Sequence, residues 1–151
     1  MEPPATDWQD VSCTMSSHPI HHLEQWAAGA FAEFAAERAF TLTNKTSGAM
    51  WASLDFENSH FALRLVIERG YRDIELTSLR KKGRRESYSV PFFKDLKEPA
   101  QHGRWNLGVD EQLAYLRDNY AWFQEVLAED EWARTCAVLA QRCSDTFATG
   151  S

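Results

Sequence analysis

The chain has 151 residues, of which 44% are hydrophobic and 25% are charged, and its formal net charge is −6. This length and composition are typical of one globular domain, and they exclude a fibrous or largely disordered chain. No run approaches the ~20 apolar residues of a membrane-spanning helix, and the acidic start lacks the pattern of a signal peptide. We therefore expect a cytoplasmic protein with no membrane partner.

Charge is divided unevenly along the chain. Residues 1–58 carry −6, residues 59–106 carry +5 and residues 107–151 carry −5. Acidic ends thus enclose a basic middle, and this zoning favours contact with a charged partner more than the total charge does.

The N-terminal part predicts an irregular segment followed by a helix. Residues 1–16 contain two adjacent prolines and little apolar periodicity, so we expect an irregular lead-in. From Pro19 the apolar residues recur at steps of three and four, which predicts a helix over 19–37. Residues 17–151 are interpreted as a single α+β domain.

From residue 39 the apolar period changes to two, which predicts a meander of four antiparallel strands over roughly 39–80. A two-residue turn at Asn58-Ser59 would place Leu54 opposite Leu63. One face of the hairpin is then wholly apolar.

A second reversal is expected at residues 69–72. It would pair Ile74 with Ile67, and it would oppose Glu68 to Asp73, a like-charge pair that is unfavourable.

The remaining chain predicts further helices. Residues 78–86 form a basic loop, and residues 88–93 fit a short extended piece or a helical turn. An apolar stripe over 113–127 predicts a helix capped by Asp110, and a second stripe begins at Trp132. We therefore expect an α+β fold, in which an N-terminal helix and two C-terminal helices pack on one face of a four-stranded antiparallel meander.

The sheet face opposite the apolar one carries the main candidate site. The predicted pairing sets Arg64 opposite Ser53, with Asp55 and Glu75 in diagonal reach. A tryptophan surrounded by charged side chains predicts a site for a protein partner, because Trp and Arg are enriched in interface hot spots. An ordinary solvent-exposed sheet face is the plain alternative. The candidate residues are Trp51, Asp55, Glu57, His60, Arg64 and Glu75.

Two other functions stay open. The basic loop could bind nucleic acid or another polyanion, although the acidic remainder of the chain makes nucleic acid the less favoured partner. A small enzyme could use Asp55, Glu57 and His60 for acid–base chemistry. The candidate residues for the polyanion are Arg80, Lys81, Lys82, Arg84 and Arg85.

Motifs for cofactors, metals and nucleophiles give no signal. No Gly-rich phosphate loop and no nucleophile elbow occurs, so we expect no cofactor and interpret the chain as non-catalytic. His18, His21 and His22 are the only clustered metal-type ligands. A solvent-exposed helix start is favoured there, because no Asp or Glu completes a ligand set at helical spacing. The sequence leaves a homodimer open.

Three segments carry a resemblance: Leu54–Asn58, Leu63–Gly70 and Gln112–Tyr120. With the order helix, meander, basic loop and two helices, they are similar to small bacterial cytoplasmic proteins of the toxin-immunity type, over about half of the chain. The resemblance implies a stoichiometric inhibitor whose charged surface covers the active site of a partner protein. None of the segments is a diagnostic motif, so no functional residue is carried over.

Overall fold

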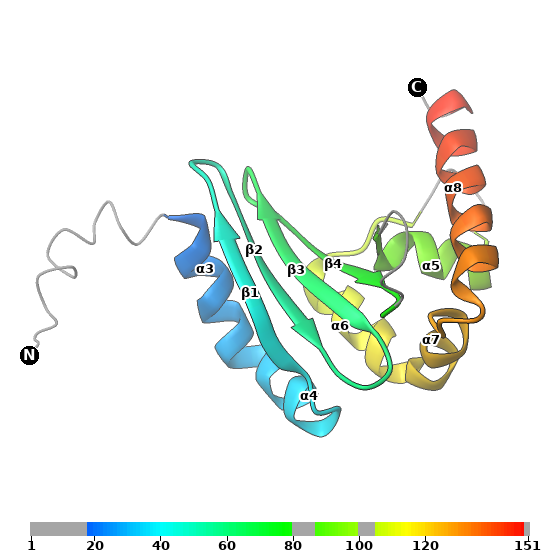
Figure 1. Cartoon of the computed structure of the whole chain (residues 1–151). Helices are drawn as coiled ribbons and strands as arrows, with labels where there is room; N and C mark the ends of the chain where they lie inside the picture. Colours follow the sequence, from blue (N-terminus) through cyan, green and yellow to red (C-terminus); the bar gives the residue numbers. More distant parts are fainter. Residues whose placement is uncertain (1–17, 80–86, 100–104, 150–151) are drawn as a thin grey trace, which may run out of the picture.

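The computed structural model describes residues 18–79, 87–99 and 105–149, with side chains as far as Arg142. The predicted lead-in over 1–16 lies outside these residues. Figure 1 shows helices beside an antiparallel sheet, which confirms the α+β class. The strands are β1 (Thr41–Ser47), β2 (Trp51–Glu57), β3 (Ala62–Glu68), β4 (Tyr71–Thr77) and β5 (Tyr88–Ser89). The helices are α3 (Pro19–Trp26), α4 (Ala32–Glu37), α5 (Val90–Lys97), α6 (Val109–Asp118), α7 (Tyr120–Val126) and α8 (Trp132–Thr149), with a π-helical segment, η1 (Ala27–Phe31), between α3 and α4.

The N-terminal helix is confirmed over the predicted range, as the continuous run α3, η1 and α4. Its start is capped by His18, whose Nδ1 accepts a hydrogen bond from the backbone N–H of Ile20 at 3.3 Å. The apolar stripe faces the core, because Leu23, Phe31 and Phe34 are each at most 1% exposed.

The sheet has five strands rather than four, in the order β1-β2-β3-β4-β5. The fifth strand is only two residues long, and the helix α5 follows it at once. Both structures considered for residues 88–93 therefore occur, one after the other. Pro91 lies in the first turn of α5, where its missing N–H is not needed.

The first hairpin is shifted by two residues from the predicted pairing. Leu54 lies opposite Leu65, and Leu63 lies opposite Phe56. The reversal is longer than expected and occupies residues 58–61. Because side chains alternate along a strand with period two, a shift of two residues leaves every side chain on its predicted face.

The side-chain amide of Asn58 holds this reversal and ties it to two helices. Its Oδ1 accepts hydrogen bonds from the backbone N–H groups of His60 and Phe61, at 2.8 and 3.1 Å. Its Nδ2 donates to the carbonyl oxygen of Arg38, just beyond α4, at 2.8 Å, and to the hydroxyl of Tyr120 in α7 at 2.7 Å. One side chain thus ties the turn to the end of α4 and to α7.

The second hairpin is tighter than predicted. Arg69 and Gly70 alone form the turn, with φ of +51° and +88°, as a type I′ hairpin requires. Glu68 therefore pairs with Tyr71, and the predicted opposition of Glu68 and Asp73 does not occur, because Asp73 lies opposite Val66. The like-charge conflict was a product of the wrong register.

The polar residues 44–48 predict a turn, but β1 continues through Ser47 and only Gly48 lies outside the strand. A bulge between Leu42 and Asn44 interrupts its pairing with β2, and all seven residues are exposed. Met50 belongs to the following turn and is 59% exposed, whereas the sequence pattern places it on the apolar face opposite Ile67. Ala52 takes that position.

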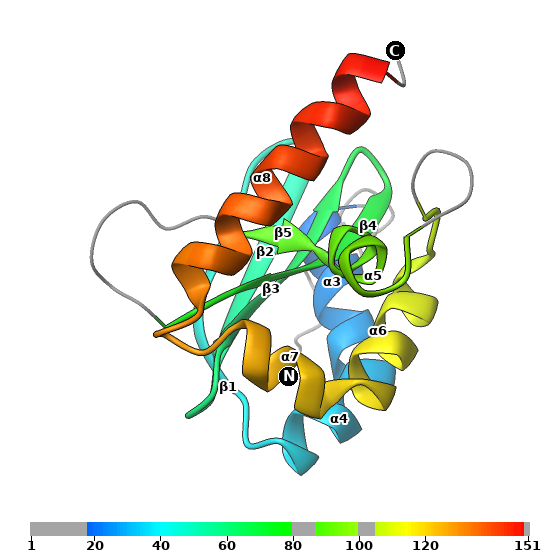
Figure 2. The same cartoon turned by 90° about the vertical axis from the view of Figure 1, so that its right-hand side faces the viewer.

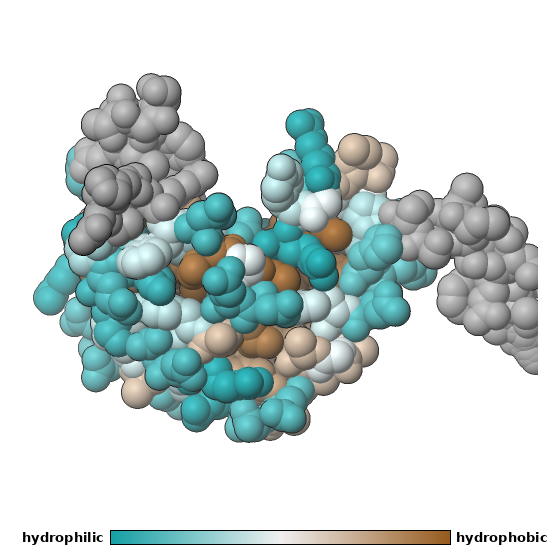
Figure 3. Space-filling model, turned by 180° about the vertical axis from the view of Figure 1, so that it is seen from behind, coloured by the Kyte–Doolittle hydropathy of each residue, from teal (hydrophilic) through white to brown (hydrophobic). Residues whose placement is uncertain are grey.

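Helices cover one face of the sheet, which we call the inner face. Here α3 packs on β2 and β3, and α6 packs on β4, as Figure 2 shows. The indole N–H of Trp26 donates to Asp110 at 3.0 Å and joins these two helices. From this side the surface is mostly polar, with apolar side chains in a central hollow (Figure 3).

The predicted pair of C-terminal helices is three helices. Asn119, with φ of −119° and ψ of +26°, separates α6 from α7, and its Nδ2 bonds to the carbonyl oxygen of Tyr115. The predicted break near residue 129 separates α7 from α8. The last helix, α8, packs chiefly on α5 beyond the β5 edge and not on the inner face, which corrects the expected layering (Figures 1 and 2).

Gly70, in the two-residue turn, and Gly29, in a helix, should respond in opposite ways to substitution by alanine. Gly70→Ala should lower the free energy of unfolding by about 1 kcal/mol, because a Cβ is unfavourable at positive φ. Gly29→Ala should raise it by about 0.5 kcal/mol, because Gly29 is helical and an added Cβ meets nothing within 4 Å. Urea unfolding with an unchanged m-value measures both. Equal effects of the two changes would contradict the turn assignment.

The Asn58 network predicts a larger loss. Asn58→Ala removes four hydrogen bonds and should lower the free energy of unfolding by about 2 kcal/mol. Asn44→Ala is the matched control, because Asn44 is exposed in β1, and it should change the stability by less than about 0.5 kcal/mol. Similar values for the two variants would show that Asn58 does not organise the reversal.

Candidate functional site

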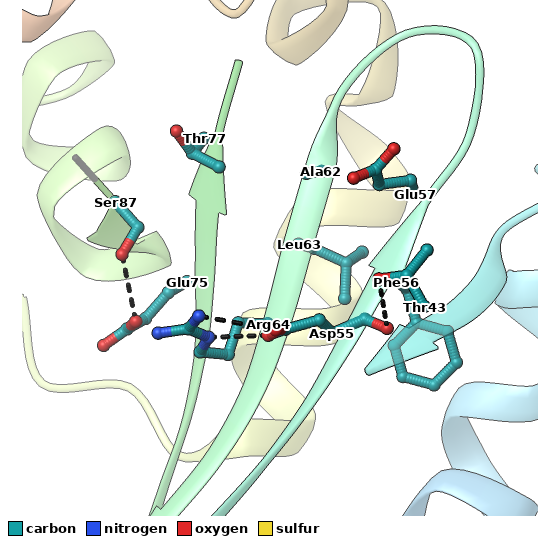
Figure 4. A pocket seen from close by; sticks show the side chains of 10 residues that line it. All are labelled: Thr43, Asp55, Phe56, Glu57, Ala62, Leu63, Arg64, Glu75, Thr77 and Ser87. Atoms are coloured by element: carbon teal, nitrogen blue, oxygen red, sulfur yellow. Dashed lines mark hydrogen bonds and ion pairs between the residues drawn. The ribbon is translucent and has the colours of Figure 1, made fainter. Parts of the chain in front are cut away.

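Three charged side chains form one row across the sheet face opposite the helices, which we call the outer face. Asp55 of β2 lies opposite Arg64 of β3, and Arg64 lies opposite Glu75 of β4. The sequence pattern expects diagonal neighbours and sets Ser53 opposite Arg64. The two-residue shift makes them direct neighbours instead, so the charges alternate along the row (Figure 4).

Arg64 is held by both oxygens of Asp55. Its Nε lies 2.6 Å from Oδ1 and its Nη2 lies 3.4 Å from Oδ2. This hydrogen bonding raises the pKa of Arg64 above its ordinary value. The side chains are 49% and 23% exposed, so the pair contributes little to stability, and its main effect is to fix the orientation of the guanidinium.

Glu75 stands at the other end of the row in a more enclosed setting. Burial raises the pKa of its carboxyl above the ordinary value, although Arg64 and a hydrogen bond from Ser87 act in the opposite direction. The Ser87 hydroxyl donates to Oε1 at 3.1 Å. Ser87 directly precedes β5, so the fifth strand brings this hydroxyl to the row.

The row borders a hollow of about 230 Å³ in the outer face. Glu57 and Thr77 lie at one end of it, apart from the Asp55–Arg64 pair, as Figure 4 shows. Three carboxylates and one guanidinium line the hollow, so its charge is negative. It can accept a cationic or hydrogen-bond-donating group of small size.

A second row on the same face, which we call the aromatic row, has an aromatic side chain at each end. Trp51, Glu68 and Tyr71 lie opposite one another across β2, β3 and β4. Trp51 is 42% exposed and Tyr71 is 81% exposed. Two strand spacings, about 10 Å, separate the backbones at Trp51 and Tyr71. Trp51 packs over the β1–β2 turn, since a Cβ added at Gly48 would meet its Nε1 at 2.2 Å.

The structure thus brings together Asp55, Glu57, Arg64 and Glu75, and it places Trp51 on the same face outside the hollow. His60 does not join them. It lies in the reversal 58–61, where the centroid of its ring is 6.2 Å from that of Tyr120 in an edge-to-face arrangement. The acid–base set that an enzyme reading requires, Asp55 and Glu57 with His60, is therefore not assembled around the hollow.

Sequence reasoning missed two members of the outer face, Tyr71 and Ser87. The sequence pattern places Tyr71 in the turn, because it predicts a second reversal of four residues, 69–72. Ser87 becomes a neighbour of Glu75 only through β5, whose register sets Ser89 opposite Glu75. The short extended piece expected at 88–93 was the available signal.

The other candidates are placed as follows. Arg80, Lys81, Lys82, Arg84 and Arg85 lie outside the described residues. Of the histidine cluster, His18 caps α3 and His21 contacts Glu24 at 4.0 Å. In the described part of the chain, no three His, Cys, Asp or Glu side chains are arranged to hold a metal ion.

Comparisons with protein-family models, with curated proteins and with solved structures found no match to this chain. The likeness to toxin-immunity proteins therefore stays a prediction from the sequence. None of the helices in the described residues has both the length and the apolar character needed to cross a bilayer.

The enclosed carboxyl of Glu75 predicts a pH-dependent stability. The pKa of Glu75 is raised in the folded state, so its protonated carboxyl contributes to the free energy of unfolding. This contribution is fully present below the ordinary pKa of 4.5 and is lost as pH rises through the raised value. Glu75→Gln keeps an acceptor for Ser87 without the charge, and it should be more stable than the parent protein at neutral pH. Below pH 4.5 the difference should shrink. Urea unfolding at both pH values measures this, and a less stable variant at neutral pH would contradict the burial argument.

Proposed function

We propose that the chain is a non-catalytic protein-binding module that receives its partner on the outer face. The observation that carries the proposal is the exposed aromatic pair Trp51 and Tyr71 on the same face as the charged row. Trp, Tyr and Arg are the residue types that dominate binding energy at protein interfaces. A sheet face presents them on a rigid support.

The hydrogen-bonded carboxylates of Asp55 and Glu75 fit recognition of a partner better than proton transfer. Asp55 is occupied by Arg64, and Glu75 accepts the Ser87 hydroxyl. Fixed side chains lose little conformational freedom on binding, so they recognise a partner at low entropic cost. The negative hollow then suits a lysine or arginine side chain of the partner, flanked by contacts to the aromatic row.

The proposed chemistry defines the class of the partner. A protein with a basic, accessible patch is complementary to this face. The toxin-immunity resemblance adds a role to that binding. The chain would act as a stoichiometric inhibitor, whose outer face covers the active site of a basic toxin.

A site-specific crosslinking experiment tests the proposal. A photoreactive amino acid replaces Glu68, which pairs with both Trp51 and Tyr71 in the sheet, or Glu33, an exposed residue of α4. In the native host, we expect one protein to crosslink from position 68 and not from position 33. Its affinity for the purified chain should fall about tenfold in Trp51→Ala and in Glu57→Lys.

Glu33→Lys is the charge-matched control for this measurement and should leave the affinity unchanged. Unfolding curves confirm that the variants are folded. Equal crosslinking from both positions, or an affinity insensitive to Glu57→Lys and Trp51→Ala, would exclude the outer face as the binding surface.

A further inference from the structure

The β4 edge of the sheet is only partly covered. The fifth strand pairs with Glu75 and Leu76 and with no earlier residue of β4. It ends at Ser89 because α5 begins at the next residue and turns the chain away from the sheet. The outward side of β4 before Glu75 therefore has no neighbouring strand among the described residues.

A side chain replaces the missing strand at one position. The Oε1 of Gln112 in α6 accepts the backbone N–H of Ile74 at 2.8 Å, as the carbonyl group of a neighbouring strand would. Its Nε2 donates to Asp73 and to the carbonyl oxygen of Leu107, at 2.8 and 3.0 Å. Gln112 is fully buried, and every polar atom of its amide is bonded.

The outward groups of Arg72 are left open. Glu68 and Tyr71 flank the two-residue turn, so their backbone groups bond to each other. The backbone N–H and C=O groups of every second residue of β4, beginning with Arg72, therefore point away from β3. The bond from Ile74 to Gln112 agrees with this alternation. Neither β5 nor any side chain in the described ranges bonds to the N–H or C=O of Arg72.

These groups border a groove of about 1210 Å³ between β4 and the segment 105–111. Four carboxylates and one guanidinium contribute charge to its described lining, namely those of Asp73, Glu75, Asp110, Glu111 and Arg72. Each carboxylate accepts a hydrogen bond from an uncharged group of the chain. The groove is therefore acidic, and it presents Trp105 as an aromatic wall.

We propose that this groove binds an extended basic peptide segment of a partner protein, which adds to the β4 edge as an antiparallel strand. One residue of the segment exchanges both backbone hydrogen bonds with Arg72. Gln112 limits the pairing to this position, so the affinity is modest and depends on the charges. Lysine or arginine side chains of the segment meet the groove carboxylates. The site shares Tyr71, Glu75 and Ser87 with the outer face, but it does not depend on the function proposed for that face.

The test uses the full chain and a defined probe, the peptide acetyl-Lys-Val-Lys-Val-Lys-Val-amide. Titration followed by backbone NMR should shift the amide signals of Arg72 and Ile74, and bound peptide should slow hydrogen exchange at the Arg72 amide. The peptide with Glu in place of Lys should not bind. The Lys peptide with methylated backbone nitrogens should bind at least about fivefold more weakly, since it cannot donate to β4.

Two variants separate the backbone from the side chain. Arg72→Pro removes the outward N–H without breaking a bond to β3, and it should weaken binding at least about fivefold. Arg72→Ala keeps the N–H and should bind the peptide as well as the parent chain or better. If Arg72→Pro does not fold, the methylated peptide makes the same comparison on the unaltered protein.

Several results would overturn the inference. These are equal binding of the Lys peptide and its methylated form, equal binding of the Lys and Glu peptides, or no signal change at Arg72 up to the solubility limit of the peptide. Shifts confined to Asp55 and Glu57 would place the peptide on the outer face instead. That outcome would reject this groove while leaving the protein-binding proposal for the outer face intact.

Discussion

The hydrogen bonds of the Asn58 side chain set the geometry on which the candidate site depends. They close the β2–β3 reversal at its observed length, and that length determines which residues of β3 lie opposite those of β2. The same amide bonds to Arg38 and Tyr120, so the reversal cannot change length without disturbing the contacts to α4 and α7. The alternating row of Asp55, Arg64 and Glu75 is a consequence of this one register.

The sequence predicts on which face of β2, β3 and β4 each side chain lies, but it does not predict which residues lie opposite one another. Face assignment depends only on whether a residue is odd or even along its strand, so Leu54 and Leu65 are buried and Arg64 points outward under either register. Which residues lie opposite one another depends on the length of the turn. Asn58-Ser59 and the four residues 58–61 are both reasonable reversals. The longer one is favoured by the bonds of Asn58 to His60 and Phe61, and also by its bonds to Arg38 and Tyr120, which are far away in sequence.

The rest of the site depended on contacts that no local pattern contains. Ser87 reaches Glu75 only because β5 adds to β4, and β5 is too short to show a period of its own. Gln112 directly precedes the apolar stripe over 113–127, and the sequence does not reveal that its buried amide bonds to the backbone N–H of Ile74. The sequence pattern places His60 on the outer face, because a two-residue turn makes it a strand residue, whereas the observed reversal includes it.

The two edges of the sheet differ in a way that bears on self-association. A filament of stacked sheets needs two receptive edges, one on each side, so that every added copy offers a place for the next. At β1 the bulge after Leu42 distorts the outward hydrogen-bonding groups, and Lys45, paired with Glu24 at 2.9 Å, sets a charge beside them. A sheet with one blunted edge can gain a strand at the other, but it cannot propagate the addition from molecule to molecule.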